Sequence, residues 1–247
     1  MGKRRWIPLS MFVLLLVAAL SSFAGPAGAQ PNQLQYVVIY AEFKPADTEA
    51  GGRVLDELAS QGLASVGVIR FDVLQQVDRR NFFALFEIWS SAQAFAAFEN
   101  SSATQARFTQ LAPLLEAPLD ERDGNLLEGT VNPRSRHAEP RQIFVITHVD
   151  IEPQSVAQAL PVLDTFVSDS ASDPGVQTFA LLSQSGTTNH FQLIEVFAHR
   201  QAFDAHVSAQ HTLDFRDDLQ SFIGAPYDER LYHFSSTGDA TAGGHED

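Results

Sequence analysis

The stretch APLDER at residues 117–122 returns as APYDER at residues 225–230. The two stretches are 108 residues apart (225 minus 117). An internal repeat is decisive for the fold, because the repeated unit determines both the number and the size of the domains. The chain has 247 residues and is long enough for two copies of a unit with this offset.

The offset of 108 residues holds without a gap from about residue 36 to residue 122 of the first copy. Chance identities would not keep one register over such a length, so the sequence predicts a tandem duplication of one domain. The clearest matches are NxFxLxE (81–87 and 189–195), QAF (93–95 and 201–203) and GV (67–68 and 175–176).

Each half has the pattern of a β-α-β-β-α-β unit. Apolar alternation or short apolar runs predict strands, and apolar residues three to four apart predict helices. Pro161 lies inside a predicted helix and is expected to kink or shorten it. The first half is expected to have strands at 36–43, 66–76, 82–89 and 119–128 and helices at about 48–61 and 92–115. The second half is expected to have strands at 143–149, 176–182, 191–198 and 228–234 and helices from about 156 and from 200 to 223.

Four strands and two helices in this order form a ferredoxin-like unit, and the fold class is α+β. Helices cover one face of such a sheet, while the other apolar face must also be buried. We therefore expect two ferredoxin-like (βαββαβ) domains, at 34–130 and 141–234, forming a dimeric-type α+β barrel within one chain. A polar connector from 124 to 141, including the linker 131–140, is long enough to cross between them. Pairing across two chains stays open, and the tail 235–247 is expected to be disordered.

The N-terminus has the three parts of an export signal. Lys3, Arg4 and Arg5 precede an apolar segment at 7–20, and Ala27-Gly28-Ala29 offers a cleavage site. The apolar run is shorter than the roughly 20 residues of a membrane span. We therefore expect a signal peptide at 1–29, a periplasmic or secreted protein, and no stable membrane association after cleavage. An uncleaved anchor is the alternative.

Charge and cysteine content exclude several classes of function. The chain has 16 basic and 30 acidic residues, and its net charge is −14. Nucleic acid is not an expected partner, because binding to phosphates needs basic side chains. There is no cysteine, which excludes disulfides, thiolate metal sites and cysteine nucleophiles.

The segment at 189–197, NHFxLxExF, is followed by Ala202, Phe203 and His206, and it resembles the signature of the antibiotic biosynthesis monooxygenase (ABM) family. The resemblance extends over both halves. It implies an α+β barrel, usually dimeric, so a homodimer is one expectation. It also implies oxidation of a small aromatic or quinol substrate by O₂ without a cofactor or a metal. The family is similar in fold to staphylococcal haem-degrading monooxygenases.

The resemblance also implies a pocket lined by a tryptophan at the end of the third strand and a histidine on the next helix. The first half has Trp89 but Phe98 at the histidine position, and the second half has His206 but Phe197 at the tryptophan position. No half carries both, which leaves two unlike pockets, one pocket or no catalytic pocket. The predicted catalytic residues are His206, Trp89 and His148, and the predicted substrate-binding residues are Asn189, Phe197, Phe203, Tyr40 and Phe98.

Structural roles compete with these assignments. His206 is also explained as a hydrogen-bonded residue at the edge of a helix stripe, Trp89 as core packing, and Asn189 as a turn residue. His148 ends a strand and is expected to face either the pocket of His206 or solvent.

Several other polar residues are expected to have structural roles. The in-register pair Glu87 and Glu195 is expected to form ion pairs with Arg122 and Arg230. Arg216 is expected to be the surface partner of the neighbouring acids 214, 217 and 218. A metal site is not expected, because the histidines at 148, 190, 206 and 211 show no recognised ligand spacing.

Three functions remain in competition. The leading one is an exported, cofactor-independent monooxygenase that uses His206 as a base. The second is a non-catalytic small-molecule binding protein on the same fold, motivated by the divided Trp/His pair. The third is haem binding or degradation, which would require the asparagine, tryptophan and histidine in one half.

Overall fold

The computed structural model describes residues 33–132 and 141–235, which lie in one compact unit, Asn32–Asp247. The predicted signal peptide (1–29) lies outside the described residues, as do most of the predicted linker (131–140) and tail (235–247). In the part of the chain that is described, no helix is long and apolar enough to cross a membrane.

The two halves repeat each other element by element, and every strand and α-helix of the second half begins 108 residues after its counterpart. The first half contains β1 (Gln35–Glu42), α1 (Thr48–Leu63), β2 (Val68–Gln76), β3 (Phe82–Trp89), α2 (Ala92–Glu99), α3 (Ser102–Leu111) and β4 (Asp120–Thr130). The second half contains β5 (Ile143–Asp150), α4 (Val156–Ser170), β6 (Val176–Gln184), β7 (His190–Phe197), α5 (Arg200–Val207), α6 (Gln210–Leu219) and β8 (Asp228–Phe234).

The helices differ from the sequence prediction in two ways. The single helix expected at 92–115 is divided into α2 and α3, and the Ser101 hydroxyl caps α3 by accepting a hydrogen bond from the Thr104 N–H (3.1 Å). The helix expected at 200–223 is divided at the same place into α5 and α6. Of the two effects expected of Pro161, a kink or a shortening, the shortening does not occur, since α4 continues through it. That proline lies in the second turn, where only one carbonyl loses its partner.

The eight strands form one closed barrel in the order β1-β3-β2-β8-β5-β7-β6-β4. Pairing of the two copies within one chain is therefore confirmed. The last strand of each half pairs with the first strand of its own half (β4 with β1, β8 with β5) and also with a strand of the other half. β8 pairs with β2, and β4 pairs with β6 from Gly124↔Gln184 to Thr130↔Phe179. The connector expected to begin at residue 124 thus begins later, because residues 124–130 continue β4.

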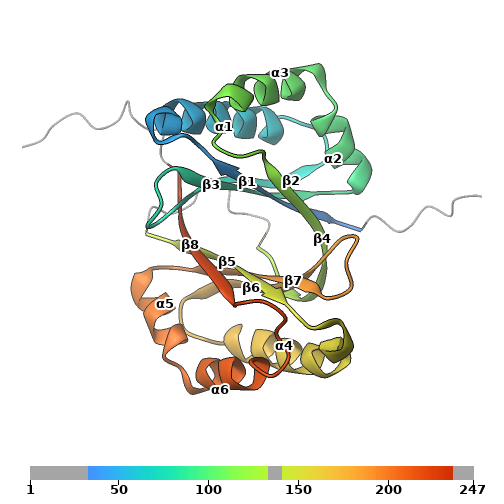
Figure 1. The fold of residues 1–247 in the computed structure, drawn as a ribbon, viewed down its shortest axis with the longest axis vertical. Coiled ribbons are helices and arrows are strands. Elements are labelled where there is room, and N and C mark those ends of the chain that lie inside the picture. The colour runs from blue at the N-terminus through green and yellow to red at the C-terminus, as the bar shows by residue number, and fades with distance from the viewer. Residues whose placement is uncertain (1–32, 133–140, 236–247) are drawn as a thin grey trace, which may run out of the picture. The chain divides into compact units, whose positions relative to one another are not determined.

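Figure 1 shows α1–α3 covering one side of the barrel and α4–α6 the opposite side. Apolar clusters fill the spaces between these layers. One lies between α1–α3 and the outer face of the first sheet, and a second lies between α4–α6 and the outer face of the second sheet. The third lies inside the barrel, where Phe86 of the first half meets Phe144 of the second with ring centroids 5.3 Å apart. Each sheet is therefore buried on both faces, as the sequence predicts.

The pairing of β4 with β6 can be tested with two glycines of similar φ. Gly129 in β4 has φ of +85°, and a Cβ there would meet the Phe179 carbonyl oxygen of β6. Gly186 in the β6–β7 turn has φ of +77° and open space around it. Gly186→Ala should cost only the backbone strain, about 1 kcal/mol, and Gly129→Ala should cost about 2 kcal/mol or more in the free energy of unfolding. Urea denaturation measures both, and equal losses would contradict the close approach of β4 to β6.

Candidate active site in the second half

The eight predicted site residues do not gather at one place. Their positions along the strands determine where they go, because successive residues of a strand face opposite sides of the sheet. They lie under the helices of the first half (Trp89, Phe98), under the helices of the second half (Phe197, Phe203, His206), inside the barrel (Tyr40, His148) and at the hairpin before β7 (Asn189).

Tyr40 and His148 are equivalent residues of the two halves, and they meet each other inside the barrel. The Tyr40 hydroxyl lies 2.7 Å from His148 Nε2, and Arg122 Nη1 lies 3.1 Å from His148 Nδ1. The guanidinium can only donate, so Nδ1 accepts and the Nε2–H donates to Tyr40. Burial and the charge of Arg122 lower the pKa of His148 to about 4, so the ring is neutral. His148 and His206 lie on opposite faces of the sheet and do not share the pocket that the sequence suggested.

The ion pairs expected for Glu87 and Glu195 do not form. Arg122 pairs with Asp120 (2.7 Å) and Arg230 with Asp228 (2.5 Å), both two residues earlier on the same strand. These arginines approach the ring of Tyr40 inside the barrel, whereas the two glutamates face the helices. Residues 120–123 are all charged, so no apolar alternation in the sequence indicates which of them face the barrel interior.

In the first half, the tryptophan and phenylalanine at the family positions are packing residues. Trp89 is fully buried, stacks on Phe98 with centroids 4.9 Å apart, and donates from Nε1 to Glu87 Oε2 (2.7 Å). Burial raises the pKa of Glu87 to about 8, so this carboxyl is protonated at neutral pH. No histidine of the described residues accompanies them, and the first half offers a filled core at this position.

In the second half, His206 forms a dyad with Asp173. His206 Nδ1 donates to Asp173 Oδ2 at 2.8 Å, because a carboxylate only accepts. The imidazole is 4% exposed, and Phe166, Phe179 and Phe197 surround it with ring centroids 5.2–5.7 Å away. Burial lowers the pKa of His206, with Asp173 opposing the shift. The Nε2 atom therefore carries a lone pair, as a general base requires.

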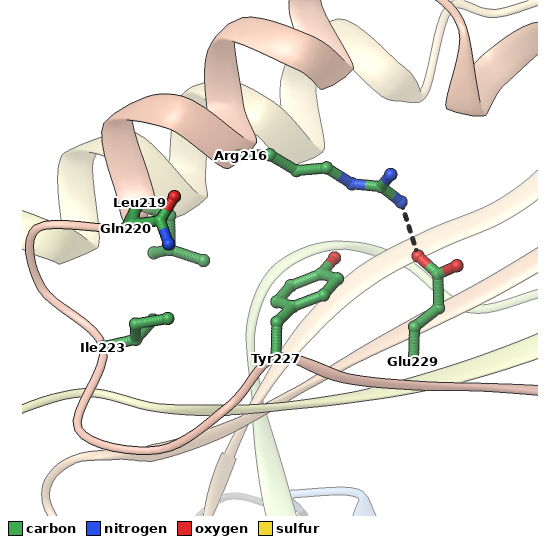
Figure 2. Close-up of a pocket in the computed structure, with 6 residues that line it drawn as sticks. All are labelled: Arg216, Leu219, Gln220, Ile223, Tyr227 and Glu229. Carbon is green, nitrogen blue, oxygen red and sulfur yellow. Dashed lines mark hydrogen bonds and ion pairs between the residues drawn. The ribbon is translucent and has the colours of Figure 1, made fainter.

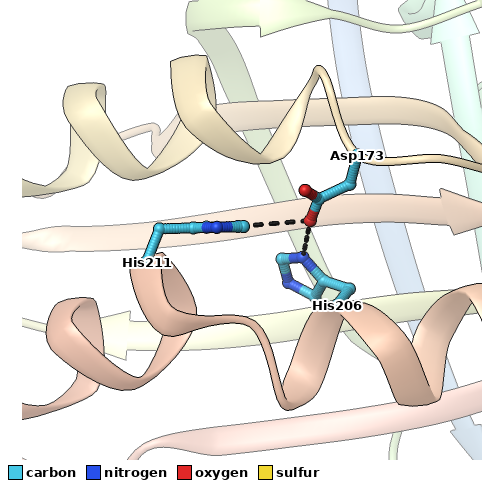
Figure 3. A group of neighbouring side chains, drawn as sticks. All are labelled: Asp173, His206 and His211. Atoms are coloured by element: carbon cyan, nitrogen blue, oxygen red, sulfur yellow. Dashed lines mark hydrogen bonds and ion pairs between the residues drawn. The ribbon is translucent and has the colours of Figure 1, made fainter.

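A second histidine, His211, reaches the same carboxylate. Its Nε2 lies 3.1 Å from Asp173 Oδ2 but is not oriented for a hydrogen bond to it. Figure 3 shows Asp173 after α4 facing His206 of α5 and His211 of α6. Sequence spacing did not predict the contact of Asp173 with His206 or with His211, because nothing in a turn sequence indicates a contact with a residue 33 positions later.

Glu195 continues the polar series on the other side of His206. Its Oε2 lies 3.9 Å from His206 Nε2, and its Oε1 lies 3.5 Å from the Thr147 hydroxyl. Glu195 is 2% exposed, and burial raises its pKa to about 8, so it is protonated at neutral pH. Burial, followed by the charges that Glu195 and Glu229 carry when ionised, raises the pKa of Tyr227 far above its usual value, and a hydrogen bond with Thr147 opposes the rise.

Tyr227 borders a cavity of about 290 Å³ that opens between α6 and the start of β8. Arg216 and Glu229 form an ion pair (2.8 Å) at its rim, and Figure 2 shows the Tyr227 ring beneath the arginine. Arg216 thus faces the cavity, and the expected pairing with its neighbouring acids is wrong. A guanidinium, a phenol and apolar walls suit a small aromatic molecule with an anionic oxygen. The remaining lining residues are Leu219, Gln220 and Ile223.

The 108-residue offset pairs each residue of this site with an equivalent residue of the first half. Each of its polar side chains except the two glutamates is replaced by an apolar or small residue in the first half. The sequence signal that could have found the site is therefore a set of polar differences between two copies of the same fold. The equivalent pairs are Ile39/Thr147, Ser65/Asp173, Phe98/His206, Ala103/His211, Phe108/Arg216 and Leu119/Tyr227.

Asn189 has a structural contact, and the first half repeats it. Its Nδ2 donates to the Ile151 carbonyl oxygen (2.7 Å), and Asn81 donates to the Phe43 carbonyl oxygen (3.0 Å). A hydrogen bond present in both halves joins the hairpin to the end of the first strand of each.

Solved structures share the fold over both halves. A proposed monooxygenase of Fusobacterium nucleatum matches with a TM-score of 0.72 and 14% identity, over 83% of this chain and 94% of its own. A proposed monooxygenase of Lactobacillus acidophilus matches with a TM-score of 0.65 and 13% identity, over 82% and 94%. An anthrone oxidase-like protein matches with a TM-score of 0.62 and 14% identity, over 83% and 92%. At these identities the likeness concerns the fold.

Sequence comparison gives one relative and one family. An uncharacterized protein of Synechocystis sp., sll1783, is 22% identical over 95 residues, 38% of this chain and 65% of that protein, so the chain covers less than two thirds of it. The family model described as antibiotic biosynthesis monooxygenase matches residues 34–109 and again residues 142–218, which together make up more than half of the chain. With one match in each half, the chain belongs to the antibiotic biosynthesis monooxygenase (ABM) family.

Proposed function

We propose that the second half oxidises a small electron-rich aromatic molecule, of the phenol or quinol class, with O₂ and without an organic cofactor. Family membership supports a monooxygenase-like function. The observation that carries the finer proposal is the His206–Asp173 dyad, which lies among aromatic rings and has no counterpart in the first half.

The substrate would bind in the cavity beside Tyr227. Its ring would pack on Tyr227 and Ile223, and an ionised phenol oxygen would face Arg216. Arg216 is held by Glu229, which fixes the direction of the guanidinium. The cavity volume lies at the lower end of the range for small-molecule sites, which favours a substrate of one or two rings.

The proton of the substrate would pass inward to His206. Thr147 contacts both Tyr227 and Glu195 Oε1 (3.5 Å), and Glu195 Oε2 faces His206 Nε2 at 3.9 Å. A protonated carboxyl can give its proton to one neighbour while it accepts another, so it connects the cavity to the base.

Deprotonation supplies the chemistry, because a phenolate is electron-rich enough to reduce O₂ without a metal or flavin. A quinol and O₂ then give a hydroxylated quinone and water. One oxygen atom enters each product, and the two hydrogens in the water come from the quinol. No external reductant is consumed.

The site of action would be outside the cytoplasm. The basic and apolar segments before residue 29 support export to the periplasm or the medium. Western blotting of cell fractions with an antibody against the second half would test this, and a full-length chain retained in the cytoplasm would contradict it.

Replacing His206 should abolish oxidation. His206→Phe recreates the residue of the first half (Phe98), so the fold should tolerate it. Loss of a general base should lower the rate of O₂ uptake with a quinol or with anthrone by about 100-fold or more. An oxygen electrode measures uptake against the autoxidation blank.

The matched control for this variant is His190→Ala, which removes a half-exposed histidine near Asp150 (3.7 Å). It should keep the wild-type rate. If wild-type uptake equals the blank, the enzymatic proposal fails, and a thermal shift with the same aromatic would then indicate a binding protein.

Replacing Tyr227 should weaken substrate binding. Tyr227→Leu matches Leu119 of the first half, and loss of one aromatic contact of about 0.5–1.5 kcal/mol should raise KM by about 3- to 10-fold. Tyr227→Phe keeps the ring and should keep most of the affinity. Leu213→Ala, on the exposed side of α6, is the control. An unchanged KM in Tyr227→Leu would place the substrate elsewhere.

The rate should depend on pH with two limbs. It should rise as His206 loses its proton, below the usual histidine pKa of 6.5 because burial lowers this pKa. It should fall near pH 8 as Glu195 ionises, because the ionised carboxyl has no proton to pass to His206 Nε2, 3.9 Å away. Glu195→Gln should lose the alkaline limb. A Gln variant that keeps this limb would assign it to another group.

A further inference from the structure

His206 Nδ1 lies in a group of three side chains that could bind a metal ion, a property that the proposed oxidation does not use. Asp173 Oδ2 lies 2.8 Å from His206 Nδ1 and 3.1 Å from His211 Nε2, and the three ligand atoms lie within 4.8 Å of one another (Figure 3). Two imidazoles and one carboxylate are the ligands of many Zn²⁺ and related transition-metal sites. Ligand atoms around such an ion are about 3 Å apart, since each lies about 2 Å from it.

A hydrogen-bond network does not account for all three groups. His211 Nε2 is buried and makes no well-oriented hydrogen bond, although it points at Asp173. A buried polar atom without a partner costs free energy, and a ligand that accepts its lone pair removes this cost.

The surroundings of His206 also suit a metal ligand. An imidazole bound to a metal through one nitrogen usually donates its other N–H to a carboxylate, which fixes the ring. Glu195 Oε2 lies 3.9 Å from His206 Nε2, and the Thr147 hydroxyl lies 3.5 Å from the other carboxyl oxygen, Oε1. A metal on Nδ1 would move the proton to Nε2 and make Glu195 its acceptor.

An acidic groove of about 430 Å³ leads from the surface to His211. It lies between α4 and α6, and three carboxylates at its edge attract cations. The groove is separate from the cavity of Tyr227, so an ion and an aromatic substrate have different entrances. The carboxylates are Asp169, Asp214 and Asp218.

The first half contains none of the three ligands. Ser65, Phe98 and Ala103 stand at the equivalent positions. Among the residues that the structure describes, one such group is found, and the first half shows which residues the fold accepts in place of the ligands.

We propose that Asp173, His206 and His211 bind one divalent transition-metal ion per chain, of the Zn²⁺ class. The ion occupies Nδ1 of His206 and leaves Nε2 protonated. Metal binding and the base role of His206 then exclude each other, so the ion inhibits the oxidation. The binding site stands independently, and only the inhibition rests on the proposed function.

Titration with Co²⁺ and Zn²⁺ tests the site in the full chain, prepared without a polyhistidine tag. Calorimetry should give one Zn²⁺ per chain, and Co²⁺ should produce visible absorption of a four- or five-coordinate ion. Variants that copy the first half, His211→Ala and Asp173→Ser, should weaken Zn²⁺ binding more than the about 10- to 100-fold caused by loss of an outer-shell partner. The control His190→Ala should leave binding unchanged.

The binding measurement separates this inference from the proposed function. Failure to bind Zn²⁺, or equal binding by wild type and His211→Ala, would overturn the metal site. A chain that oxidises quinol but binds no Zn²⁺ therefore refutes the site alone. A chain that binds Zn²⁺ but consumes no O₂, even after chelation, supports the site and refutes the proposed function. Where both activities occur, Zn²⁺ should stop O₂ uptake in the wild type and not in His211→Ala.

Discussion

Burial of the inner faces of both sheets is the constraint on which the rest of the structure depends. Helices cover each sheet on one side only, and the other side carries large apolar residues such as Phe86 and Phe144. Neither half can leave that face in water, and the two halves therefore close one barrel. The pairing of β8 with β2 and of β4 with β6 joins the two halves edge to edge and leaves no free sheet edge.

Fusion of the two copies in one chain has a chemical consequence. In a dimer of identical subunits, every substitution appears at both equivalent positions. Here Tyr40 meets His148 across the barrel, a pair of unlike residues that no identical dimer can form from one position. The same freedom lets Phe98 fill the core of the first half while His206 keeps an ionisable group in the second. One copy can thus serve stability and the other chemistry.

The repeat made most of the fold predictable, because a constant offset transfers each element from one half to the other. The ends of helices were less predictable, since the break occurs at Ser101 with a side-chain cap and at Ala209 without one, inside an apolar pattern that continues past both. The site was less predictable still. The contact of Asp173 with His206 joins residues distant in the sequence, and Arg216 stands among acids that suggest an exposed helix face. Local spacing carries no information on either contact.

The divided Trp/His pair has a physical explanation in the buried glutamate of each half. A carboxyl enclosed by apolar side chains needs a polar neighbour. Glu87 obtains one from the Trp89 indole (2.7 Å), and Phe98 then packs against that indole. In the second half Phe197 offers no donor, and His206 lies opposite Glu195 instead (3.9 Å). A tryptophan at position 197 would compete with His206 for this carboxyl, so the loss of the indole and the presence of the histidine belong together. The absence of a complete pair in either half is therefore consistent with a working site in the second.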